Sequence, residues 1–104
     1  MNIVGITDRH EPAFEQTGDL DPDLLAHLAA MCGDLPLGDD ARNLRAAALT
    51  TAHGYVFDTA GYWLSAQDGD IVITAKYGAF RGVLPREVLA GVMAQWAVHL
   101  DAIT

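Results

Sequence analysis

Residues 19–23, Asp-Leu-Asp-Pro-Asp, most resemble a metal-binding motif. Carboxylates at alternate positions can converge on a hard cation, as they do at the start of an EF-hand calcium loop. The rest of that pattern is missing, because Leu24 stands at the glycine position and Ala30 at the position of the bidentate glutamate. A helix start fits better, with Asp21 as the N-cap and Asp23 near the positive end of the helix. We therefore predict no metal site.

The other nucleophiles and histidines form no catalytic pattern. Ser65 is the only serine and lacks a nucleophile elbow. Cys32 follows His27 by five residues, which is about 140° around a helix, so the two side chains share no face. A composite site such as His53 with Asp58 leaves no mark in residue spacing, so a small enzyme or ligand-binding domain remains an alternative. The sequence otherwise predicts no catalytic residue and no cofactor.

Negative charge is concentrated in one part of the chain. The 104 residues include 14 acidic and 6 basic side chains, for a formal net charge of −8. Residues 8–40 hold nine acids against one base, a net of −8, whereas the rest of the chain holds five of each. Such a surplus repels a phosphate backbone and an anionic membrane surface. We therefore expect neither direct nucleic-acid binding nor membrane binding, and a basic protein as the partner.

Eight carboxylates and one aromatic side chain are the candidate partner contacts. Carboxylates can compete for the lysines and arginines with which another protein holds a nucleic acid, and aromatic rings beside them can anchor an interface. We also expect at least one of Tyr55, Tyr62 and Tyr77 to be partly exposed. The alternative is that the acids belong to two helix starts and a solvated loop. The candidates are Glu11, Glu15, Asp19, Asp21, Asp23, Asp34, Asp39, Asp40 and Tyr62.

These features favour a non-enzymatic acidic inhibitor that occupies a basic surface of a nuclease or another nucleic-acid-binding protein. Phage antagonists of bacterial defence, including anti-CRISPR proteins, and immunity proteins of toxin nucleases work on this physical principle, although no motif here identifies a family. The other alternative is a homo-oligomeric accessory or regulatory subunit that pairs through a strand edge. The sequence does not fix the oligomeric state.

The expected location is the cytoplasm. The chain has a single cysteine, Cys32, so it can form no internal disulfide. We expect Cys32 to be a small buried residue of the core. No segment has the pattern of a signal peptide, and no run of about 18 apolar residues could span a membrane.

Residues 2–7 form a short apolar run that suits an edge strand, and residues 8–20 are expected to be a loop. The two helices that follow are predicted from their boundary residues. A first helix should run from Pro22 to Cys32, with Gly33 in the left-handed conformation that ends many helices. A second should be capped by Asp39 or Asp40 and closed by Gly54.

The second half of the chain predicts a sheet and a last helix. From Tyr55 the apolar pattern has a period of two, and Asp68-Gly69 is a strong hairpin signal. Residues 80–84 can add a further strand. Pro85 should open the last helix, on which Val98 points outward. Its apolar face consists of Leu89, Val92, Met93, Trp96, Leu100 and Ile103.

The sequence thus predicts one α+β domain over residues 1–104. Its elements are two N-terminal helices, a small antiparallel sheet of three or four strands, and a C-terminal helix packed on one face of that sheet.

Overall fold

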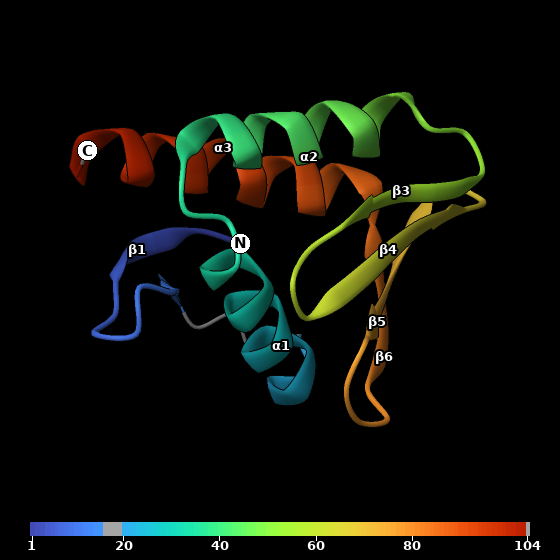
Figure 1. The fold of residues 1–104 in the computed structure, drawn as a ribbon, viewed down its shortest axis with the longest axis horizontal. Coiled ribbons are helices and arrows are strands. Elements are labelled where there is room, and N and C mark those ends of the chain that lie inside the picture. Colours follow the sequence, from blue (N-terminus) through green and yellow to red (C-terminus); the bar gives the residue numbers. More distant parts are fainter. Residues whose placement is uncertain (16–19, 104) are drawn as a thin grey trace.

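The chain adopts an α+β fold. The computed structural model describes residues 1–15 and 20–103, in which three helices accompany a two-stranded and a four-stranded antiparallel sheet (Figure 1). The four-stranded sheet has the order β3-β4-β5-β6. The elements are β1 (Ile3–Ile6), β2 (Pro12–Phe14), α1 (Pro22–Gly33), α2 (Gly38–Thr50), β3 (Gly54–Asp58), β4 (Tyr62–Gln67), β5 (Asp70–Ala75), β6 (Arg81–Pro85) and α3 (Arg86–Ile103).

A β-hairpin precedes the helices. The N-terminal strand is confirmed, but the loop predicted for residues 8–20 contains β2, which pairs with β1. The prediction that the fold starts with two helices is therefore wrong in this detail. The connecting turn includes His10, with a φ of +62°. Three residues beginning with proline are too few to show a strand periodicity, which is why the sequence did not indicate β2.

The start of α1 is confirmed, but its end differs from the prediction. Asp21 is the N-cap, and its Oδ1 accepts a hydrogen bond from the Asp23 amide at 3.0 Å. Gly33 is the last helical residue rather than a left-handed cap, since the described glycines with positive φ are Gly54, Gly69 and Gly78. Asp34 takes the C-cap position in a helical conformation.

The predicted boundaries of α2 are wrong at both ends. Leu37, not Asp39 or Asp40, is the N-cap, and the Asp40 carboxylate accepts from the Leu37 amide at 3.2 Å. Asp40 still satisfies an otherwise unpaired amide at the helix start, but from within the first turn. The helix stops at Thr50, and Gly54 uses its positive φ of 87° to begin β3.

The predicted alternation holds along β4, whereas β3 has a register shift between Tyr55 and Phe57 and Val72 of β5 is buried like its neighbours. Asp68 and Gly69 connect β4 to β5 with φ values of 50° and 85°, which are the positive values that a tight hairpin turn needs. The inward side chains join one hydrophobic core with residues of all three helices. On the sheet these inward residues are Val56, Tyr62, Leu64, Ala66, Ile71, Ile73, Ala75 and Leu84.

The last helix lies beside α2 (Figure 1) and also contacts β5 and β6 of the four-stranded sheet. Its predicted apolar face is buried from Leu89 to Leu100, whereas Ile103 in the last turn is exposed and that part of the prediction is wrong. Val98 is exposed, as predicted. Pro85 ends β6, and the helix begins at the next residue. The α3 helix contacts β1, β5 and β6, while α2 contacts β3, so the two helices share the sheet.

One glutamine of α3 fixes the N-terminal hairpin. Gln95 Oε1 accepts from the Ile3 amide at 2.7 Å, and Gln95 Nε2 donates to the Met1 carbonyl at 3.0 Å. His99 Nε2 lies 3.3 Å from the Ile3 carbonyl oxygen. Side chains of α3 thus satisfy the hydrogen bonds of backbone groups at the edge of β1, where another strand could otherwise pair.

We predict that Gln95→Leu lowers the free energy of unfolding by about 1–3 kcal/mol, because it leaves a partly buried amide and carbonyl without partners. Urea denaturation of the variant beside Gln67→Leu, which changes an exposed glutamine, measures this effect. Equal unfolding midpoints for the two variants would show that Gln95 does not hold the hairpin.

Candidate functional site

A surface hollow of about 520 Å³ lies between the α1–α2 connection and the β3–β4 turn. Carboxylates from the α1–α2 connection, from α2 and from β3 line it, together with one lysine, and the remaining lining residues are mostly apolar. The lining residues are Asp34, Leu35, Pro36, Asp40, Phe57, Asp58, Thr59, Ala60 and Lys76.

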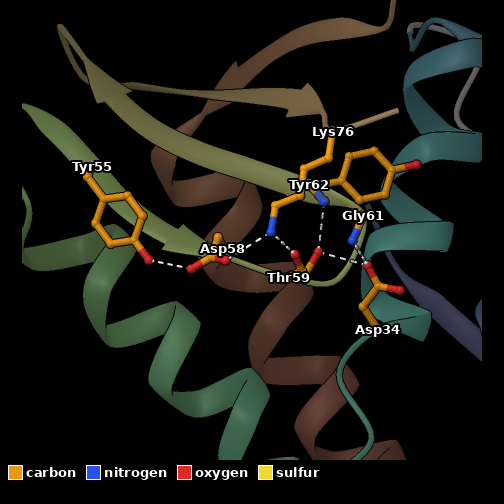
Figure 2. A network of polar contacts seen from close by, with 7 residues as sticks. All are labelled: Asp34, Tyr55, Asp58, Thr59, Gly61, Tyr62 and Lys76. Atoms are coloured by element: carbon orange, nitrogen blue, oxygen red, sulfur yellow. Dashed lines mark hydrogen bonds and ion pairs between the residues drawn. The ribbon is translucent and has the colours of Figure 1, made fainter. Parts of the chain in front are cut away.

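Asp34 joins the end of α1 to the β3–β4 turn. Its Oδ2 accepts a hydrogen bond from Thr59 Oγ1 at 2.7 Å and another from the Gly61 amide at 3.0 Å (Figure 2). Thr59 is buried, and its Oγ1 also accepts from the Tyr62 amide at 3.1 Å. This network fixes the turn and with it one wall of the hollow.

Asp58 is the centre of a second group of polar contacts (Figure 2). Tyr55 Oη donates to Asp58 Oδ1 at 2.6 Å, and Lys76 Nζ lies 2.9 Å from Asp58 Oδ2. Lys76 Nζ also donates to the Thr59 carbonyl at 2.6 Å. The hydrogen bond from Tyr55, followed by the contact with Lys76, lowers the pKa of Asp58. The same hydrogen bond is also the largest cause of the raised pKa of Tyr55.

The structure separates the predicted acidic residues into groups. Asp34 and Asp40 line the hollow. Glu11 lies at the same end of α1, since a Cβ added at Gly33 would lie 3.0 Å from Glu11 Cγ. Burial, then Glu11 and Asp34, raise the pKa of the Cys32 thiol. Asp34 and Asp40 therefore line one hollow, whereas Glu11 lies next to Gly33 at the nearby end of α1 and is not part of the lining.

The other predicted carboxylates lie elsewhere. Asp21 and Asp23 are at the opposite end of α1, which has 12 residues and is therefore about 18 Å long. Asp39 pairs with Arg42 at 2.7 Å, and that guanidinium also contacts Asp101. Glu15 accepts from the Asn2 side chain at 3.0 Å. Asp19 lies outside the described residues.

The prediction that Tyr62 contacts a partner stays untested, but the structure leaves little of this side chain open to one. Its side chain is on the inward face of β4, only 7% exposed, and its Oη lies 2.7 Å from His27 Nδ1. Burial, then the charges of Asp34 and Glu11, raise its pKa. The expectation of at least one exposed tyrosine is confirmed, since Tyr55 is 67% and Tyr77 82% exposed. The alternating pattern along β4 already places Tyr62 on the same face as Leu64, which is the buried face.

Sequence reasoning did not assign Asp58, Thr59 or Lys76 to a common site. Thr59 precedes Lys76 by 17 residues and follows Asp34 by 25, so no local spacing connects these side chains. Asp58 was considered only as a partner of His53. His53 directly precedes β3 and Asp58 ends it, which puts them about 16 Å apart along an extended strand. The partners of Asp58 are Tyr55 and Lys76.

Other chemistry finds little support in the described residues. Within 1–15 and 20–103, no three His, Cys, Asp or Glu side chains are grouped so that they could hold a metal ion. Cys32 is buried, as predicted, and its raised pKa keeps the thiol protonated, which is the unreactive form. None of the helices in the described part of the chain is long and apolar enough to cross a membrane.

Comparison with protein-family models, with curated proteins and with solved structures gives no match to this chain. The site must therefore be interpreted from its own geometry.

We predict that Tyr55→Phe raises the pKa of Asp58 toward the ordinary aspartate value, because the variant removes the hydrogen bond that contributes most to lowering it. An NMR titration of the Asp58 carboxyl carbon measures the change. Tyr77→Phe is the matched control, as it removes the hydroxyl of another exposed tyrosine. An unchanged Asp58 titration in Tyr55→Phe would contradict the assignment.

The same shift predicts how stability depends on pH. A carboxyl whose pKa is lower in the folded state adds stability that is fully present above the ordinary value of about 3.9. That contribution is lost as the pH falls through the lower folded value. Urea unfolding at several acidic pH values should therefore show a smaller acid-induced loss in Tyr55→Phe than in the parent. Parallel curves would contradict this linkage.

Proposed function

We propose that the protein is a non-enzymatic acidic binding protein that occupies a basic surface of another protein. The observation that carries the proposal is the hollow, in which Asp34, Asp40 and Asp58 face one surface region with Lys76 as the single cation of the lining. A hollow rich in carboxylates suits a protruding lysine or arginine. It does not suit a phosphate or a polyanion.

The electrostatics of the whole chain support the same partner. A net charge of −8 attracts a basic surface over long range and raises the rate of encounter. Exposed aromatic side chains next to the hollow, Tyr55 and Trp63, supply apolar contact area of the kind that anchors interfaces. Charge then contributes selectivity and rate, and the rings contribute affinity.

The partner class we propose is a nuclease or another nucleic-acid-binding protein of the cytoplasm. Such proteins present clusters of lysine and arginine that hold a phosphate backbone. Carboxylates placed on those side chains block the nucleic acid by competition. The proposed contact is centred on the end of α1 and on the β3–β4 turn, whereas the sequence predicts contacts over residues 11–40 and at Tyr62.

We predict that the triple variant Asp34→Asn, Asp40→Asn, Asp58→Asn weakens partner binding about tenfold or more, since each charged contact contributes up to about 1 kcal/mol. Asparagine keeps an acceptor oxygen at each position, so the hydrogen bonds from Thr59 and Leu37 can persist. The assay is capture from a lysate of the source organism. A gradient from about 0.05 to 1 M salt, which progressively screens charge contacts, then releases the bound protein.

The matched control is Asp8→Asn, Asp68→Asn, Glu87→Gln, which removes the same number of charges from exposed positions away from the hollow. The proposal requires the hollow variant to release the captured basic protein at much lower salt than this control does. Release of the partner at equal salt from both variants would show that the contact lies outside the hollow. If the parent captures no basic protein that salt releases, the proposed function is wrong.

A further inference from the structure

One end of the sheet carries exposed aromatic rings beside the hollow. Trp63 is 50% exposed and points outward from β4, opposite the inward neighbours Tyr62 and Leu64. In the sheet register Trp63 pairs with Asp58 across β3 and with Thr74 across β5. An indole face and a carboxylate thus stand side by side at the mouth of the hollow.

The protein already holds a cation at this place. The Lys76 ammonium lies 2.9 Å from Asp58 Oδ2 and 2.6 Å from the Thr59 carbonyl oxygen (Figure 2). It also lies 5.6 Å from the centre of the Trp63 ring, within the range of a cation–π contact. Carboxylate, carbonyl and ring together form a cation subsite that the chain fills with its own lysine.

We propose that this subsite recognises an arginine side chain of the protein partner, with Lys76 as the internal competitor that the arginine displaces. This inference rests on the proposed function and specifies the chemistry of the contact. The partner's guanidinium stacks on the Trp63 indole and donates to Asp58, whose carboxylate has lone-pair sites beyond those used by Tyr55 and Lys76.

The geometry selects arginine over lysine. An incoming lysine exchanges one ammonium for another and gains nothing over Lys76, which is tethered next to the subsite and so competes at high local concentration. A guanidinium is planar and weakly hydrated, so it gains more from stacking on an indole, and its fork can make two hydrogen bonds to a carboxylate. Arginine therefore binds the subsite more favourably than an ammonium group does, and this difference allows it to displace Lys76.

The test compares hepta-arginine with hepta-lysine, which carry equal charge, by NMR titration of the parent protein at low salt. The indole N–H of Trp63 reports on the subsite. Trp96, which is buried and donates to the Cys32 carbonyl at 2.9 Å, provides an internal reference that should not move. We expect hepta-arginine to shift the Trp63 indole resonance and to bind about threefold or more tighter than hepta-lysine.

Three variants separate stacking from charge. Trp63→Leu should lower the affinity for hepta-arginine to that for hepta-lysine. Tyr77→Leu, which removes a more exposed ring, should leave the preference intact. Lys76→Met should tighten hepta-lysine binding and narrow the difference between the peptides, because the internal competitor is gone. Two-dimensional spectra of each variant show whether its fold is retained.

Equal affinity for the two peptides in the parent would overturn the arginine subsite. If the hollow variant Asp34→Asn, Asp40→Asn, Asp58→Asn then lost affinity for both peptides, the charge-based proposed function would stand without the subsite. If neither peptide bound the parent, both the subsite and the proposed function would be wrong. Weaker hepta-lysine binding by Lys76→Met would also contradict the displacement of Lys76.

Discussion

The Asp34 carboxylate accepts two hydrogen bonds from the β3–β4 turn, one from the buried Thr59 hydroxyl and one from the Gly61 amide. Leaving these donors without a partner would cost the desolvation of each, so the end of α1 and the turn are held together. The same contact forms one side of the hollow, which Asp34 and Asp58 both line. These hydrogen bonds thus create one wall of the candidate site, and the carboxylates around it make the site negatively charged.

The hollow also explains why only part of the acidic segment matters in this account. Asp39 is paired with Arg42, and Asp21 serves the helix start with its own oxygen. These carboxylates are engaged in local structure. Asp34 and Asp40 also accept hydrogen bonds, Asp34 from the β3–β4 turn and Asp40 from the Leu37 amide, but each does so with one oxygen and lines the same hollow as Asp58. The negative charges of Asp34, Asp40 and Asp58 therefore act together at a surface that a partner can reach.

The sequence predicts the elements that have strong local signals and loses those that depend on distant contacts. Asp21 before proline and the Asp68-Gly69 turn are local signals, and both predictions hold. The β2 strand exists because it pairs with β1. The start of α2 is misplaced for a local reason, since Asp40 accepts from the Leu37 amide from within the first turn instead of serving as the N-cap. The site is less predictable still, because Asp34 and Thr59 are 25 residues apart and meet only in the folded chain.

Hydrogen exchange of the Gly61 amide tests most directly whether Asp34 holds the turn. The account predicts that Asp34→Ala accelerates this exchange about tenfold or more, because the amide loses a hydrogen bond to a charged acceptor. The amide of Ile73, in the buried centre of β5, should keep its protection and show that the fold persists. Unchanged exchange at Gly61 in a folded Asp34→Ala variant would contradict the account.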